Sequence, residues 1–382
     1  MKYLAHYSLV LTILLLNACG GSSSNSNQTL PADDNNSDEN SSELLAKNEP
    51  YYKYSWHIDS KNSILNSKGY AIDANADIHI IEAWKLTEGE GVKVAVIDDA
   101  FDVNHEDLKD NIYIAYNVDN NTNDVSNKYP INNEYGTSHG NTCAGFIVAP
   151  INGKGIVGTA PKSKLIAIKL EGETDSIVIK AFEYAKNQGA QVISCSWGTE
   201  NMSDSIDAEL KSLYDANITV LFASGNDGKN LDDAGIRDES ESKWVLGVSA
   251  SGENNDVTSY SNYGKELDIL APGGDHLDSI GVLGIDDSGE RGSHNQHGMV
   301  SEDYAFTSGT SFSSPIAAGV VALMYSINPN ITPIQVRDIL IHNSDKIGGN
   351  DAAYIDGFDE KRAYGKINAL KAVNAAKALL GV

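Results

Sequence analysis

From about residue 49 to the end of the chain, short apolar runs alternate with longer segments of amphipathic spacing. Five runs are continuously apolar and rich in β-branched residues, as strands buried on both faces are: 92–97, 164–169, 192–196, 219–223 and 245–249. Helical spacing of apolar positions fills four further segments: 176–187, 205–215, 333–342 and 369–380. This alternation predicts one α/β domain with a doubly wound, mostly parallel central sheet and helices on both faces.

The amino-terminal region follows a different pattern. An apolar run over 8–16 is too short to span a bilayer as a helix, and it predicts a signal peptide over residues 1–18. The run ends at Leu16-Asn17-Ala18-Cys19, which resembles a bacterial lipobox, so Cys19 is the expected lipidation site. Gly20 after the cysteine suits sorting to the outer membrane of a Gram-negative cell. An ordinary signal with a chance cysteine is the alternative.

Composition divides the rest of the chain. Residues 19–48 are mainly Ser, Asn, Asp and Glu, which predicts a disordered tether, and residues 49–382 have the composition of a globular domain. The formal net charge of −25 argues against a nucleic-acid partner, because a polyanion would be repelled. Beyond Cys19, only Cys143 and Cys195 remain, both in apolar surroundings, and we expect two buried free thiols.

Three segments carry residue types suited to nucleophilic catalysis. A carboxylate, Asp98, ends the first apolar run; His139 begins an apolar helical segment; Ser311 follows Gly309-Thr310 at the start of another. Taken singly, each has a plain structural explanation, because a strand-closing turn or a helix cap uses the same residue types. Ligands of parallel sheets bind beyond the carboxyl ends of the strands, so all three are expected at one edge.

These segments resemble the motifs of the subtilase family of serine peptidases. Val-Ile-Asp98, His139-Gly-x-x-x-Ala-Gly and Gly-Thr-Ser311-x-x-x-Pro stand in the family's order, and the resemblance covers the chain from about residue 49. It implies a triad in which Asp98 orients His139 and Ser311 is the nucleophile. It also implies that Asn226 is an oxyanion donor and that Ser196, Trp197 and Gly198 bind substrate as an added strand.

Some details are similar to the kexin-like branch, including Asp98-Asp99 and Cys143. Acidic residues follow both the expected substrate strand and Asn226, which predicts a preference for a basic residue before the scissile bond: Glu200, Asp204, Asp207, Asp227, Asp232, Asp233, Asp238 and Glu239. Asn201 argues against this preference, because a kexin-like enzyme places a pocket acid at about that position.

The resemblance also implies a structural Ca²⁺ site. Asp107 and Asn152 match family ligands and Glu49 is a further candidate, and their oxygens suit a hard cation. The alternative is a set of solvated turn residues. The chain departs from the family pattern at Ala100, where glycine is usual and the turn is expected to be strained or slightly rebuilt, and at Asn141-Thr142.

We therefore expect an exported serine endopeptidase that is anchored in the cell envelope by a lipid and acts on protein or peptide substrates. No inhibitory and folding prodomain fits between Cys19 and Glu49, so a separate folding helper is an expected partner. A catalytically inactive subtilase-fold lipoprotein with a binding or scaffold role is the alternative. A nucleotide-binding protein is rejected, because Gly89 and Gly91 precede the first strand, whereas phosphate loops follow it.

Overall fold

The structure is a computed structural model that describes residues 41–129, 138–172, 174–233, 235–275, 279–292 and 296–381. The signal peptide, Cys19 and most of the predicted tether lie outside these residues. At the end of the tether the structure differs from the prediction, because α1 (Ser41–Ala46) is helical. Ala46 is fully buried and α1 contacts α2 (Ile80–Trp84), so this end of the tether is part of the folded body.

Seven parallel strands form the central sheet in the order β2-β3-β1-β4-β5-β6-β7. Their bounds are Lys93–Asp98 (β1), Ile112–Asn117 (β2), Lys164–Lys169 (β3), Val192–Cys195 (β4), Thr219–Ala223 (β5), Leu246–Ser251 (β6) and Ile269–Pro272 (β7). All five predicted strands are present, and β2 and β7 are additional. The predicted doubly wound α/β fold is confirmed.

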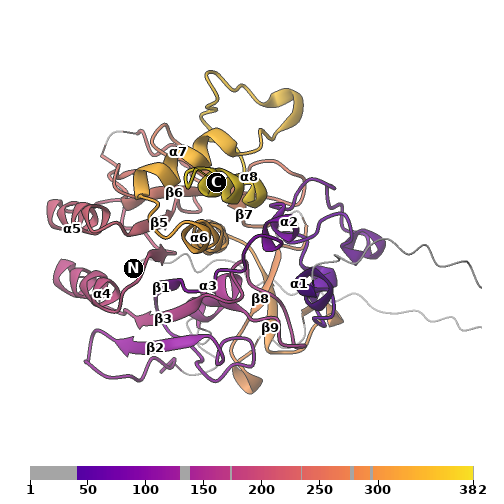
Figure 1. Cartoon of the computed structure of the whole chain (residues 1–382), viewed down its shortest axis with the longest axis horizontal. Coiled ribbons are helices and arrows are strands. Elements are labelled where there is room, and N and C mark those ends of the chain that lie inside the picture. Colours follow the sequence, from indigo (N-terminus) through magenta and orange to yellow (C-terminus); the bar gives the residue numbers. More distant parts are fainter. Residues whose placement is uncertain are drawn as a thin grey trace, which may run out of the picture.

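Helices cover both faces of the sheet (Figure 1). One face packs against α4 (Asp175–Asn187) and α5 (Asp204–Asp215), and alternate residues of β1 such as Ala95 and Ile97 belong to this core. The other face packs against α3 (His139–Val148) and α6 (Thr310–Ile327), where Val94 and Val96 are buried. The central strands are mainly apolar because they are buried on both sides.

The helix α6 runs through the middle of the molecule (Figure 1). It is long and apolar enough to cross a membrane, but 89% of its length is buried inside the protein, as expected of a core helix. Toward the carboxyl end, α7 (Pro333–Asn343) and α8 (Ala369–Ala378) pack against each other, and α8 also contacts α6. These two helices and α4 and α5 agree with the sequence prediction.

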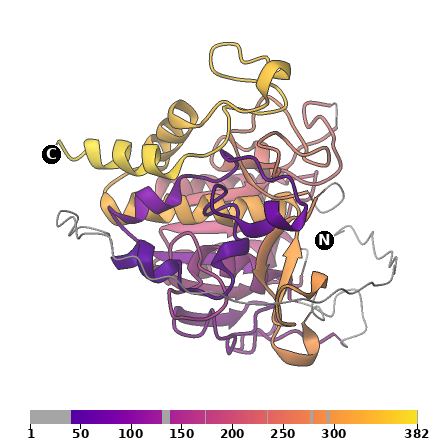
Figure 2. The same ribbon diagram turned by 90° about the vertical axis from the view of Figure 1, so that its right-hand side faces the viewer.

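A separate antiparallel pair, β8 (Val282–Ile285) and β9 (Tyr304–Thr307), lies beside α3. Figure 2 shows this pair at one side of the molecule, away from the carboxyl terminus. The remaining described elements are short 3₁₀ helices: Tyr52–Tyr54, Ile64–Lys68, Glu239–Glu241, Gly289–Arg291, Gln296–Gly298 and Gly349–Asp351. The strand β8 packs against α3. The segment that follows β8 reaches the start of that helix, where Asp287 bonds to Ser138.

Candidate active site

The three predicted catalytic residues come from three elements at the carboxyl edge of the sheet. Asp98 ends β1, His139 begins α3, and Ser311 is the second residue of α6. The Nδ1 atom of His139 lies 2.9 Å from Oδ1 of Asp98. Because Nδ1 faces the carboxylate it carries the ring proton, and Nε2 is left as the acceptor.

Cys143 joins the Asp98–His139 pair to the serine. Its Sγ lies 3.8 Å from His139 Nδ1 and 3.4 Å from the carbonyl oxygen of Ser311. The thiol also donates to Ser196 Oγ at 3.3 Å, and Ser196 Oγ donates to the same Ser311 carbonyl at 2.7 Å. Cys143 and Cys195 are both buried free thiols, as predicted.

Asp99 holds the first turn of α3 in place. Its carboxylate accepts the backbone N–H of His139 at 3.3 Å and that of Gly140 at 2.9 Å, and so satisfies two N–H groups that the helix leaves free. A Cβ atom on Gly140 would lie 2.7 Å from the Cβ of Asp98, so only glycine permits this approach of helix and strand. The His-Gly pair is therefore a packing requirement as well as a catalytic motif.

Electrostatics make His139 a strong base. Burial lowers the pKa of His139, but the charge of Asp98, the neighbouring Cys143 and the hydrogen bonds to both together hold the pKa well above its usual value. Burial, followed by the charge of Asp98, raises the pKa of Asp99 to about 7. The raised pKa of His139 means that the charge of Asp98 stabilises the imidazolium that forms when His139 takes a proton at Nε2.

The predicted strain at Ala100 is absent. Ala100 is not among the non-glycine residues with positive φ, so an alanine fits this turn without cost. Its backbone N–H donates to Oδ1 of Asp99 at 2.6 Å. Of the two expectations for this turn, strain was wrong, because Ala100 does not use the left-handed conformation for which glycine is needed.

Asn226 lies beside the start of α6, as an oxyanion donor must. Its Oδ1 accepts the backbone N–H of Thr310 at 2.8 Å and the Thr310 hydroxyl at 2.9 Å. These two bonds fix which end of the amide faces Thr310 and leave Nδ2 as the donating end. The backbone N–H of Ser311 belongs to the first turn of α6, where the helix itself supplies no acceptor.

A cleft of about 680 Å³ contains Ser311, Asn226 and the predicted substrate strand. Ser196, Trp197 and Gly198 line one side of it, directly after β4. The Ser311 hydroxyl donates to the carbonyl oxygen of Ser196 at 3.3 Å, so nucleophile and substrate strand are in contact.

Part of the predicted acidic group borders this cleft. Glu200, Asp227, Asp238 and Glu239 line it, whereas Asp204 and Asp207 pair with Arg237 outside it, and Asp232 and Asp233 are not in its lining. Asp238 and Glu239 are almost fully buried, and burial raises the pKa of both carboxyl groups. Within the described residues neither forms an ion pair, so this end of the cleft has two desolvated carboxylates with no cationic partner.

The three predicted Ca²⁺ ligands lie together near α1. Glu49 Oε1 accepts the N–H of Gly153 at 2.9 Å, and its buried Oε2 has no hydrogen-bond partner in the described structure. Asp107 is fully buried, and Asn152 Nδ2 lies 3.4 Å from its Oδ1. Burial, with a contribution from the charge of Glu49, raises the pKa of Asp107 to about 7.

These features fit a cation rather than a set of solvated turn residues. Two buried carboxylates repel each other, and one has an unsatisfied oxygen, which is costly unless a cation balances them. Asn152 Oδ1 accepts the N–H of Lys154 at 2.9 Å while Nδ2 faces Asp107, so the amide would have to reorient for its oxygen to serve as a ligand.

Sequence reasoning missed the residues that hold the oxyanion segment. Thr310 orients Asn226, and Asn262 is nearly buried, with Oδ1 accepting the N–H groups of Asp227 and Lys229 at 3.0 Å each. Asn262 lies 36 positions beyond Asn226 in an ordinary turn sequence, and no local pattern marks it.

A model of the subtilase family matches residues 89–365, a range that contains all three triad residues. The chain belongs to the subtilase family. A protein named a probable subtilase-type serine protease, from Deinococcus radiodurans, is 34% identical over an alignment of 331 residues that covers 81% of this chain and 43% of that protein. A calcium-dependent protease of Nostoc is 32% identical, over 85% of this chain and 51% of its own length. The chain thus spans about half the length of these curated relatives.

A dibasic-processing endoprotease of Yarrowia lipolytica is 29% identical over 80% of this chain and 32% of its own length. Among solved structures, a protease from Pseudoalteromonas arctica superposes with a TM-score of 0.71 at 25% identity, over 86% of this chain and 99% of that one. A serine protease of Aeromonas sobria, solved in complex with a chaperone, gives a TM-score of 0.70 at 20% identity, over 87% of this chain and 67% of that one. The last likeness concerns the fold alone.

Proposed function

We propose that this protein is a serine endopeptidase that hydrolyses peptide bonds through an acyl-enzyme. The observation that carries the proposal is the bond between His139 and Asp98 beside a nucleophile-bearing helix start, at the edge of a cleft that contains Asn226. The family membership of the chain supports the same reaction.

In the proposed mechanism the Ser311 hydroxyl turns from the Ser196 carbonyl toward His139 and attacks the scissile carbonyl. His139 Nε2 takes the hydroxyl proton, and Asp98 stabilises the imidazolium that forms. Asn226 Nδ2 and the N–H of Ser311 donate to the oxyanion, and the positive end of the α6 dipole favours the same charge. His139 then protonates the leaving amine, and water releases the acyl group by the reverse steps.

The decisive experiment is labelling with a serine-directed fluorophosphonate. The wild-type protein should be labelled and should cleave peptides, and Ser311→Ala should do neither while keeping its circular dichroism spectrum. Asn226→Ala should keep the label but lose about 10²–10³ in kcat, the effect of one oxyanion donor. Absence of labelling in folded wild type would favour the inactive scaffold lipoprotein, and activity in Ser311→Ala would remove the assignment altogether.

We further propose a preference for Arg or Lys immediately before the scissile bond. Asp238 and Glu239 lie buried in the cleft behind Gly198, and a Cβ on Gly198 would lie 2.6 Å from Oδ2 of Asp238. A basic substrate side chain would supply the cation that these carboxylates lack, through charge-assisted bonds. The dibasic-processing relative is consistent with this preference, and the neutral Asn201 in the lining weakens it.

Paired peptides that differ only at this residue test the preference. Wild type should cleave after Arg faster than after Leu, and Asp238→Asn should lower kcat/KM for Arg by roughly 10- to 100-fold more than for Leu, as expected when a charged hydrogen bond is lost. Asp204→Asn, outside the cleft, is the matched control and should change neither rate. Equal or faster cleavage after Leu by the wild type contradicts the proposal.

A structural Ca²⁺ ion is proposed at Glu49, Asp107 and Asn152. The unsatisfied Oε2 of Glu49 beside a second buried carboxylate supports it, as does the name of the calcium-dependent relative. When bound, the ion would neutralise these carboxylates and fasten the opening segment to the loop around Gly153; it has no part in the chemistry of bond cleavage.

We also propose export and anchoring in the outer membrane of a Gram-negative cell through a lipid on Cys19. The support is the lipobox-like Leu16-Asn17-Ala18-Cys19. Mass spectrometry of the membrane fraction should find an acylated Cys19 as the first residue, and Cys19→Ala should abolish the acylation. A soluble protein that begins at another residue would contradict the anchor.

A further inference from the structure

A second cavity, of about 340 Å³, lies beside the amino terminus of α3 and shares no lining residue with the substrate cleft. Its walls come from the loop after β1, the loop after β2 and the segment after β8. Three carboxylates, Asp102, Asp124 and Asp287, line it, together with Arg291 and several amide and hydroxyl groups. The cavity is therefore rich in oxygen atoms and carries more negative than positive charge.

Asp287 is the most deeply buried of these carboxylates, with 2% of its surface exposed. Its Oδ2 accepts both the backbone N–H of Ser138 at 3.1 Å and the Ser138 hydroxyl at 3.0 Å. Its Oδ1 is buried and has no hydrogen-bond partner in the described part of the chain. Burial, with the charges of Asp286 and Asp102, raises the pKa of Asp287 to about 6. An unsatisfied carboxylate oxygen in this position is costly unless a cation or a proton balances it.

A fully buried amide holds the acidic segments together. Asn141 Nδ2 donates to the carbonyl of Asp286 at 2.7 Å, and Asn141 Oδ1 accepts the N–H of Asp102 at 3.2 Å. The carboxylate of Asp102 accepts the N–H of Ser288, the neighbour of Asp287, at 3.2 Å. Asn141 is one of the two positions at which the His139 motif departs from the family pattern, and this cross-link is the structural role of that departure.

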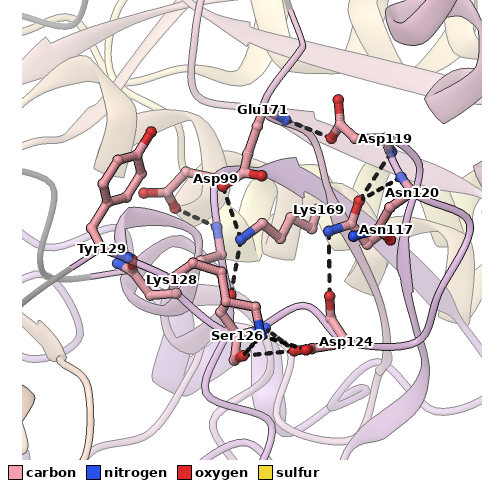
Figure 3. A network of polar contacts seen from close by, with 12 residues as sticks. Asp99, Asn117, Asp119, Asn120, Asp124, Ser126, Lys128, Tyr129, Lys169 and Glu171 are labelled. Carbon is pink, nitrogen blue, oxygen red and sulfur yellow. Dashed lines mark hydrogen bonds and ion pairs between the residues drawn. The ribbon is translucent and has the colours of Figure 1, made fainter.

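The opposite wall is fixed by a buried lysine (Figure 3). Lys169, with 1% of its side chain exposed, donates to the carbonyl of Ser126 at 2.8 Å and pairs with Glu171 at 3.0 Å. In the same loop Asp124 pairs with Lys128, and Arg291 donates to the carbonyl of Tyr129 at 3.0 Å. The wall that carries Asp124 and Ser126 is thus held by several bonds before any ligand arrives.

We propose that this cavity is a second divalent cation site, of the Ca²⁺ class, in which Asp287 Oδ1 and the Asp102 carboxylate are the charged ligands. A hard cation takes six to eight oxygen ligands, and water with the amide and hydroxyl oxygens of the cavity would complete the set. The site shares no residue with the Glu49–Asp107–Asn152 group. Since Asp287 also holds Ser138, an ion here would fix the backbone directly before His139.

Calcium counting on the full-length protein tests the proposal without any need for peptidase activity. Equilibrium dialysis with radioactive Ca²⁺ is carried out on Ser311→Ala, which prevents self-cleavage. Asp287→Asn in that background should bind about one ion fewer per chain, because a charged ligand is removed with little change in shape. Asp204→Asn, whose carboxylate is exposed, is the control and should bind as many ions as the parent.

Asp107→Asn should remove a different ion, so the double variant Asp107→Asn/Asp287→Asn should lose both. If Asp287→Asn does not fold, Asp102→Asn carries the test, and it must lose the same ion. Unchanged stoichiometry and affinity in folded Asp287→Asn, or in folded Asp102→Asn, would overturn the site. That result would mean that a proton on Asp287 or the charge of Arg291 balances the cavity.

Discussion

At the scale of single residues, His57 is the least satisfied polar side chain in the core. Its imidazole is fully buried, and neither ring nitrogen has a hydrogen-bond partner in the described structure. It packs edge-on against the rings of Trp56 and Phe146, with centroids 6.3 Å and 5.5 Å away. Burial alone lowers the pKa of His57 to about 3.

This burial predicts a loss of stability in mild acid. The folded pKa lies below the unfolded value, so the unfolded chain takes the proton first, and the free energy of unfolding falls as pH drops from about 6.5 toward 3. The loss from this one group is on the order of a few kcal/mol. His57→Leu should flatten that part of the curve, and His342→Gln, at an exposed site, should not. Melting temperature against pH in the Ser311→Ala background checks this, and parallel wild-type and His57→Leu curves would contradict it.

The sequence predicts catalytic residues well where a short motif fixes them locally. Asp98, His139 and Ser311 each stand in a run of neighbours whose backbone conformation the chemistry requires, such as the Gly140 approach to Asp98. No local motif marks Asp287, because its structural role is to accept hydrogen bonds from Ser138, which lies 149 positions away in the sequence. Residues that act through long-range contacts are found only once the fold is known.

At the scale of elements, buried strands and amphipathic helices were predictable from period and composition, and β2 and the β8–β9 pair were not. The strand β2 lies at the edge of the sheet and is half-exposed, so its residues lack the continuous apolar run of a central strand. The strands β8 and β9 have four residues each and pair across a long connection. Short strands whose partners are far apart in sequence leave no periodic signal.

We expect the opening segment of the domain to depend on the ion proposed at Glu49. Tyr51 N–H donates to the carbonyl of Gly155 at 2.8 Å, and Glu49 accepts from Gly153, so the segment and the Asn152 loop are held mainly at this point. Chelation should therefore lower the melting temperature and expose the segment to proteolysis, and added Ca²⁺ should restore both by mass action.

The matched variants for this test are Asp107→Asn, which should respond less to EDTA than the parent because only the ion proposed at Asp287 is left to remove, and Asp110→Asn, at an exposed neighbouring position, which should respond as the parent does. Ca²⁺ at a concentration about a hundred times its Kd adds about 2.7 kcal/mol to the free energy of unfolding. The melting temperature should therefore shift by several degrees. A parent protein with the same melting curve in EDTA and in Ca²⁺ would contradict the site.

At the scale of the whole molecule, the parts that must meet come from distant positions in the chain. The first strand, β1, lies between β3 and β4, and the triad joins the ends of β1, α3 and α6. Near the carboxyl terminus, the N–H of Ala369 donates to the carbonyl of Ile78 at 2.8 Å, and Lys366 bonds to the carbonyl of Asn75. The opening and closing segments of the domain are thus hydrogen-bonded to each other, and neither is a local folding unit.

This topology predicts slow and inefficient folding of the isolated domain, because parallel pairings distant in sequence cost loop entropy before their contacts form. Purified Ser311→Ala, diluted from denaturant into buffer with Ca²⁺, should regain its near-ultraviolet circular dichroism over seconds or longer, with loss to aggregation. Addition of extract from the native host, as a source of the folding helper expected from the sequence, should raise the yield, and the same extract after heat inactivation is the control. Full recovery within about a second from the purified chain alone would show that the domain needs no partner to fold.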